Sequence, residues 1–304
     1  MADSALATRA ASPYLRPEFV NTAVGTAMVG DVERRLTLYE RISNVDPVRK
    51  FTVLLAVIVA WELYTQISAV PELIFPTFSS TAAALVHAVT DEGLLVNVWN
   101  SISVLLAGYA IGILIAGILV VLSVATRFGS DLLTTLTAML NPLPAIALLP
   151  MAMIWFGLGT SAIIFTLLHS IIWPVALNTH SGFQSVSETM RMVGRNYGLR
   201  GIPFILKLLV PAAFPSILTG LRIGWAFAWR TLIAAELVFG GSVMDTSGGN
   251  SGGLGWVIFQ NQMNLRIPYV FAGLFTVILV GVIIENVIFR TVEERTIKKW
   301  GMQQ

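Results

Sequence analysis

Long apolar segments, separated by shorter polar ones, dominate the pattern of this chain. A helix that crosses the hydrocarbon core of a bilayer needs about 20 mostly apolar residues. The charge-free stretch 132–187 is too long for one such helix, and the turn-like residues 157–161 (Gly-Leu-Gly-Thr-Ser) divide it in two. The predicted spans are 51–69, 98–125, two helices within 132–187, 212–239 and 268–289. We therefore expect an all-α, polytopic membrane protein with about six transmembrane helices.

The regions outside the spans predict two further helices. Residues 31–43 (DVERRLTLYERIS) fit a short amphipathic helix at the inner surface, and a frayed polar tail is the alternative. Residues 75–89 fit a short outer helix capped by Ser79 or Ser80. The expected organisation is a cytoplasmic tail over 1–50, a transmembrane domain over 51–290 with a cytoplasmic loop at 181–210, and a tail over 291–304.

Composition agrees with a membrane protein. The 304 residues are 55% hydrophobic and 12% charged, whereas soluble domains are about 25% charged. The net charge of +2 sits at helix ends and forms no basic stripe, so nucleic-acid binding is not expected. Because the chain contains no cysteine, disulfides and thiol chemistry are excluded.

The distribution of Lys and Arg predicts the orientation. Cations precede the first span, follow the sixth, and fill the loop after the fourth. The loop 70–97 contains no Lys or Arg, and the loop 240–267 contains Arg266 as its single cation. Since cytoplasmic loops are enriched in Lys and Arg, both termini are predicted to be cytoplasmic.

No nucleotide or metal site is predicted. The glycine-rich residues 248–255 lack the Lys-Ser/Thr of a phosphate-binding loop and lie in an outer loop. Residues 157–162 fit G-x-G-x-x-A, but no strand precedes them. His169 and His180 share one helix face but lie about 16 Å apart along the axis, too far for one metal ion.

Ionisable residues inside spans are expected to face protein or water, because each costs about 3 kcal/mol or more at the bilayer centre. Arg230 is the deepest cation among five such residues, Glu62, Arg222, Arg230, Glu236 and Glu285. Arg230 allows two interpretations: it attracts an anionic substrate, or it pairs with Glu62 or Glu236 across helices.

The third predicted span is interrupted by Asn141, Pro142 and Pro144. Broken backbone at membrane depth is tolerated where it is buried in protein or lines a cavity. The break therefore fits either a translocation path or a packing kink. His169 and Trp173, on the fourth span, fit a helix face that packs on protein or lines such a path.

The loop after the fourth span predicts a docking element. Residues 191–198 can form about two helical turns, which Gly198 and Gly201 would end, and Pro203 would redirect the chain. A short helix across the inner face with its cations outward could bind a cytoplasmic partner; an ordinary positive-inside loop is the alternative. The residues assigned to the docking helix are Arg191, Met192, Val193, Gly194, Arg195, Asn196, Tyr197 and Gly198.

In this loop, and in three other segments, the sequence resembles the permease subunits of ABC importers, most closely the nitrate/sulfonate/taurine/bicarbonate group. Gly198, Pro211 and Pro215 hold the glycine and proline places of the family loop, while residues 192–194 (Met-Val-Gly) stand where Glu-Ala-Ala is usual. The other matching segments are 141–150, 154–159, and 235–236 with 253–255.

The resemblance implies a type I ABC importer permease in a bacterial inner membrane. Two copies would form the translocation path, two ABC ATPase subunits would dock on the cytoplasmic loops, and an extracytoplasmic binding protein would deliver a small, anionic solute. This chain would bind no cofactor, since ATP and Mg would be held by the ATPase. The alternative is a self-sufficient secondary transporter or channel that uses Arg230, Glu62 and Glu236. A membrane-embedded enzyme is ranked last, since no catalytic constellation is found.

Overall fold

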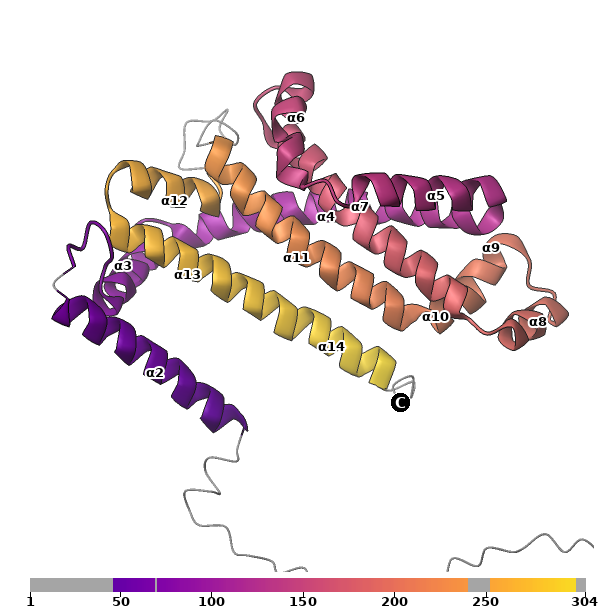
Figure 1. Ribbon diagram of the computed structural model, residues 1–304, viewed down its shortest axis with the longest axis horizontal. Coiled ribbons are helices and arrows are strands. Elements are labelled where there is room, and N and C mark those ends of the chain that lie inside the picture. The colour runs from indigo at the N-terminus through magenta and orange to yellow at the C-terminus, as the bar shows by residue number, and fades with distance from the viewer. Residues whose placement is uncertain (1–45, 69, 240–251, 299–304) are drawn as a thin grey trace, which may run out of the picture. The chain divides into compact units, whose positions relative to one another are not determined.

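The computed structural model describes residues 46–68, 70–239 and 252–298, and over this part it is entirely helical. The predicted amphipathic helix at 31–43 lies outside these residues. From Val57 onward the chain forms one compact unit (Figure 1). In chain order the helices are α2 (Asp46–Ile67), α3 (Phe78–Thr90), α4 (Leu94–Ala125), α5 (Arg127–Leu140), η1 (Ala145–Leu148), α6 (Leu149–Phe156), α7 (Thr160–Ser185), α8 (Glu188–Asn196), α9 (Gly201–Phe204), the π-helix η2 (Ile205–Leu209), α10 (Val210–Ala212), α11 (Phe214–Phe239), α12 (Leu254–Met263), α13 (Ile267–Ile283), the π-helix η4 (Ile284–Phe289), α14 (Arg290–Glu293) and the π-helix η5 (Glu294–Lys298).

The prediction of an all-α, polytopic membrane protein is confirmed. Four described helices are long and apolar enough to cross a bilayer, and there are six such spans if each of two bent pairs counts as one. The first bend is 90° between α5 and the η1–α6 segment, at the Asn-Pro-Leu-Pro break. The second is 79° between the segment 201–212 and α11. The last helix runs to Lys298, well past the predicted end of the sixth span.

Helices α4, α7 and α11 form the core, with α7 packed against both of the others and lying beside α11 in Figure 1. Glycines permit this close packing, as is common between membrane helices. A Cβ atom at Gly112 of α4 would lie 2.7 Å from Ile171 of α7, and one at Gly220 of α11 would lie 2.8 Å from Asn178 of α7. Tyr109 adds a hydrogen bond of 2.8 Å from α4 to a carbonyl of α11.

The short helix α3 is held at the end of α2 by a carboxyl group. Glu62 accepts hydrogen bonds from the Ser79 hydroxyl (2.8 Å) and backbone N–H (3.1 Å), at the first turn of α3. The predicted cap at Ser79 or Ser80 is wrong: Thr77 is the N-cap, and its hydroxyl accepts from the Ser80 N–H. Glu62 lies at the positive, N-terminal end of α3, where a negative charge is favourable. Its carboxyl group is therefore already bound to a helix close to it in the sequence.

The two predicted outer loops meet, as their shared side of the membrane requires. Arg266, just before α13, donates a hydrogen bond to Glu92, between α3 and α4, and lies 3.7 Å above the ring of Tyr269. The hydrogen bond to Glu92 raises the pKa of Arg266. The sole cation of these two loops is therefore used to join them.

Candidate functional site

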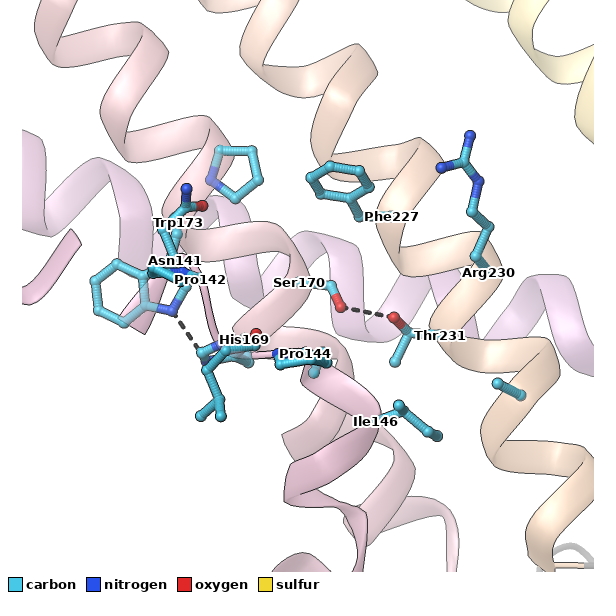
Figure 2. A pocket seen from close by; sticks show the side chains of 14 residues that line it. Asn141, Pro142, Pro144, Ile146, His169, Ser170, Trp173, Phe227, Arg230 and Thr231 are labelled. Atoms are coloured by element: carbon cyan, nitrogen blue, oxygen red, sulfur yellow. Dashed lines mark hydrogen bonds between the residues drawn. The ribbon is translucent and has the colours of Figure 1, made fainter. Parts of the chain in front are cut away.

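A cavity of about 360 Å³ lies where the break in the third span faces α7 and α11 (Figure 2). Its walls come from residues 141–146, from α7 and from α11. Six of the seven residues predicted for a translocation path line it, namely Asn141, Pro142, Pro144, His169, Trp173 and Arg230. The backbone break therefore borders a cavity, which is one of the two settings in which broken backbone is tolerated at membrane depth.

Hydrogen bonds orient the side chains on the α7 wall. The Trp173 indole N–H donates to Nδ1 of His169 at 3.0 Å, and Nε2 of His169 lies 3.0 Å from the Leu143 carbonyl oxygen. Since Nδ1 accepts, the ring proton belongs on Nε2, which donates to Leu143. His169 thus holds the broken segment against α7, and Trp173 fixes the tautomer that allows it.

The α11 wall carries Arg230, a cation with no carboxylate bound to it in the described residues. Arg230 is exposed and forms no ion pair among the residues that the structure describes. The expectation that it pairs with Glu62 or Glu236 is wrong, because both carboxyl groups have other partners. The next residue, Thr231, shares a hydrogen bond of 2.9 Å with the Ser170 hydroxyl of α7, which ties the two walls together (Figure 2).

Glu236 does not line this cavity, although it was predicted to lie on the path. It is only 4% exposed and belongs to a buried clamp between α4, α11 and the start of α12. Its carboxyl group accepts from the Ser101 hydroxyl (2.8 Å) and from the Gly255 N–H (2.8 Å). Ser101 in turn accepts from the Leu254 N–H at 2.7 Å.

Sequence reasoning missed Ser101 as a partner in this clamp. A single serine in an apolar run is ordinary in membrane helices, and Ser101 is 135 residues from Glu236. The glycines would have been a better signal. A Cβ atom at Gly253 would lie 2.1 Å from the Glu236 carboxyl group, so a larger residue there would displace that group from its hydrogen bonds.

The docking segment forms a helix, α8, close to the predicted position. Ser187 caps it by accepting from the Met190 N–H, and Glu188 lies in its first turn, where a negative charge is favourable. Gly198 has φ of +78°, so it ends the helical region as predicted, but α8 begins earlier, at Glu188. Pro203 does not redirect the chain, since it lies in the first turn of α9.

The charges of α8 differ from the prediction in one respect. Arg191 does not point outward: its guanidinium donates to the carbonyls of Phe183 and Val186, at the C-terminal end of α7. It therefore fixes the angle between α7 and α8 by satisfying carbonyls that the helix end leaves unpaired. Arg195 remains exposed.

The exposed surface of α8 mixes charged and polar residues with a few apolar ones. Met192 and Val193 are about half exposed, and Tyr197, just beyond the helix, is 85% exposed. Gly194 is buried, because a Cβ atom there would lie 2.4 Å from Leu208. The Met-Val-Gly sequence thus combines two exposed apolar residues with one glycine that packs on the next helix.

Comparison with known proteins identifies the family of this chain. Residues 108–298, more than half of the chain, match the model of the binding-protein-dependent transport system inner membrane component. The chain belongs to this family. It is therefore a multi-pass inner-membrane component of an ABC importer, and its subunit type is non-catalytic, since the ATPase activity lies in a partner subunit. A permease of this family is not expected to bind a cofactor itself.

The chain is also similar to individual transport proteins. The chain is 29% identical over 227 residues to an Escherichia coli K12 protein named provisionally as an aliphatic sulfonates transport permease, covering 75% of this chain and 80% of the relative. It is 29% identical over 199 residues to the nitrate import permease of Synechocystis, covering 66% and 69%. It is also 31% identical over 145 residues to the taurine transport system permease of Escherichia coli K12, covering 48% and 49%.

Proposed function

We propose that two copies of this chain form the translocation path of an ATP-driven importer for a small anion of the nitrate, sulfonate, taurine or bicarbonate kind. The observation that carries the proposal is Arg230. It is a cation within a transmembrane helix, it is exposed on the subunit, and it has no carboxylate partner in the described part of the chain.

The energetics support a path rather than a lipid-facing surface at Arg230. A lone arginine in hydrocarbon costs about 3 kcal/mol or more, so an exposed one must meet water or a second protein surface. The cavity beside it is open on one side in the part of the chain that the structure describes. A second copy placed over this face would enclose the cavity and leave Arg230 facing the passing solute.

The relatives support an anionic solute. The names of three similar proteins assign them to aliphatic sulfonates, nitrate and taurine, each of which carries an oxyanion group. A guanidinium is the side chain best suited to a planar or tetrahedral oxyanion, because it presents several N–H donors in a fixed fork. Arg230 is expected to supply that interaction once for each copy.

We also propose that 51–290 is the permease domain and that α8, within the loop 181–210, docks on the ATPase. Its exposed apolar residues and Arg195 form a compact surface, and its attachment to α7 through Arg191 is rigid. A movement of the ATPase would therefore pass directly to α7, which packs on both α4 and α11.

The test is transport by the whole importer in proteoliposomes. The chain is purified with its ATPase and binding protein, and ATP-driven uptake of labelled nitrate, taurine and bicarbonate is measured for Arg230→Gln, Arg230→Lys and Arg290→Gln. The last removes a cation that pairs with Glu294 at the cytoplasmic end of the last helix.

We expect Arg230→Gln to lower uptake at least 10-fold, Arg230→Lys to lower it less, and Arg290→Gln to leave it unchanged. Uptake unaffected by Arg230→Gln would refute the anion path. Gradient-driven flux by the chain alone, without ATPase, would instead support a self-sufficient transporter. Light scattering of the purified chain tests for the dimer.

A further inference from the structure

The segment 201–212, formed by α9, η2 and α10, has no role in the function proposed so far. It lies at 79° to α11, beyond the ends of α7 and α11 (Figure 1). With 26 residues, α11 is about 39 Å long, which exceeds the thickness of the hydrocarbon core, about 30 Å. By apolar composition it qualifies as a span only when the segment 201–212 is counted with it. The bend between them lays this segment across the end of α11 that is predicted to be cytoplasmic.

Three faces of this segment have different surroundings. Phe204 and Leu208, one turn apart, lie against Gly194 of α8. Ile205 and Leu209, on the adjoining face, are buried in the core. The third face is exposed.

Ile202 and Leu206 make up this third face and are 63% and 60% exposed. They lie about half a turn around the helix from the Phe204–Leu208 face, given 100° per residue. The segment is thus held between α8 on one side and an exposed apolar pair on the other. Since the topology places α8 on the cytoplasmic side, the apolar pair points back toward the bilayer.

Cations border the same face. Arg200, at the N-cap of α9, and Lys207, beside Leu206, are both exposed, and neither forms an ion pair in the described residues. An apolar strip bordered by basic residues is the pattern of helices that lie in the interface of anionic membranes.

We propose that residues 201–212 form an interfacial helix on the inner leaflet. Ile202 and Leu206 insert among the acyl chains, and Arg200 and Lys207 bind anionic phospholipid headgroups. The ATPase is excluded from this face because α8, which would bind it, lies on the opposite side of the helix. That the apolar face points toward the bilayer follows from the cytoplasmic position of α8. The proposed function assumes the same position, so this inference rests on the proposed function.

The absence of cysteine from the chain makes a direct test possible. Leu206→Cys carries a nitroxide spin label in one sample, and Val193→Cys, on the exposed side of α8, carries it in the control. The full chain is placed in nanodiscs of phosphatidylcholine with phosphatidylglycerol. Collision with oxygen, which prefers lipid, is compared with collision with a water-soluble nickel chelate, before and after addition of the ATPase.

We expect the label at position 206 to favour oxygen and the label at 193 to favour nickel, with at least a three-fold difference in their collision ratios. Equal ratios at the two positions would overturn the proposal, as would shielding of position 206 from nickel only when the ATPase binds. If position 206 lies in lipid but the ATPase shields neither label, the interfacial helix stands and ATPase docking on α8 is refuted.

A second arm tests the commitment to anionic lipid. The collision ratio at position 206 is measured as the phosphatidylglycerol fraction rises from zero to one half. It should rise about two-fold in the parent and stay flat in an Arg200→Gln, Lys207→Gln double variant, while Arg127→Gln, which removes a different inner-surface cation, should behave like the parent. An equal response of all three, or none in the parent, contradicts recognition of anionic headgroups.

Discussion

The buried clamp at Glu236 makes a sharp prediction about stability. Glu236→Ala removes the acceptor for two buried donors, the Ser101 hydroxyl and the Gly255 N–H, both at 2.8 Å. A buried donor left without an acceptor costs about 1–3 kcal/mol, so the total is about 2–6 kcal/mol. Glu236→Gln keeps one oxygen, which at the Oε2 position accepts from the Gly255 N–H and lies 2.9 Å from the Ser101 hydroxyl, so it should cost less than Glu236→Ala.

The assay is thermal unfolding of the purified chain in detergent, followed by size-exclusion chromatography. A loss of 1 kcal/mol lowers Tm by about 2–4 °C in chains of 150–250 residues, so Glu236→Ala should lower Tm by roughly 4–24 °C. Ser101→Ala removes the same interaction from the other side. Because the two residues share one hydrogen bond, the double variant should be at least 1 kcal/mol more stable than the sum of the single changes predicts.

Two results would refute this reasoning. If Glu236→Ala is as stable as the parent, the cost of burying the carboxyl group equals what its hydrogen bonds contribute. If the Ser101 and Glu236 changes add within about 0.5 kcal/mol, the two side chains are not energetically coupled, whatever their distance. Gly117→Ala, in the same helix as Ser101 and with open space at its Cβ, serves as the control and should be neutral.

Further predictions concern the packing of α4 and the inner end of α11. Gly112→Ala should destabilise the chain by about 1–3 kcal/mol because its Cβ meets the branched, inflexible Ile171, and no loss of Tm relative to Gly117→Ala would contradict the close packing of α4 on α7. Arg222 donates to Glu293 at 2.7 Å between α11 and the last helix, so a double-mutant cycle of Arg222→Gln and Glu293→Gln should show about 1 kcal/mol of coupling; a value near zero would mean that the pair is not maintained in the membrane.

The spans could be predicted from sequence because a bilayer imposes a single, local requirement of apolar length. The same holds for the break at residues 141–144, since proline and asparagine interrupt a helix wherever they occur. The two bends could be expected at these positions but not their angles, 90° and 79°, which depend on what each helix packs against.

The chemistry of single ionisable residues was harder to predict, because it depends on distant partners. Glu236 was assigned to the path, and its actual partner is 135 residues away in α4. Arg191 was expected to point outward from the docking helix, yet it binds carbonyls five and eight residues before it. That contact depends on the angle between α7 and α8, and the Glu236 contact depends on a residue far along the chain.

The substitution of Met-Val-Gly for Glu-Ala-Ala has a physical account in the contacts of α8. The third position of this triplet, Gly194, packs on Leu208. The Cβ atom of an alanine there would lie only 2.4 Å from the Leu208 side chain, so glycine permits the closer packing. The first two positions are exposed, so their side chains would shape the proposed docking surface rather than the fold. A surface with two apolar residues at these positions gains affinity by burying them, and its binding to the ATPase should depend less on salt than one that relies on a glutamate.

Three ionisable residues of α11 show how the face of a helix decides their function in a membrane. Arg222 is held by Glu293 at the inner end, Arg230 faces an open cavity, and Glu236 is enclosed by α4 and α12. Glu236 follows Arg230 by six residues, which turns it about 240° around the helix and directs it into the core. Opposite charges that one helix carries so close together therefore do not neutralise each other. The carboxyl group stabilises the wall, and the guanidinium remains available to a solute.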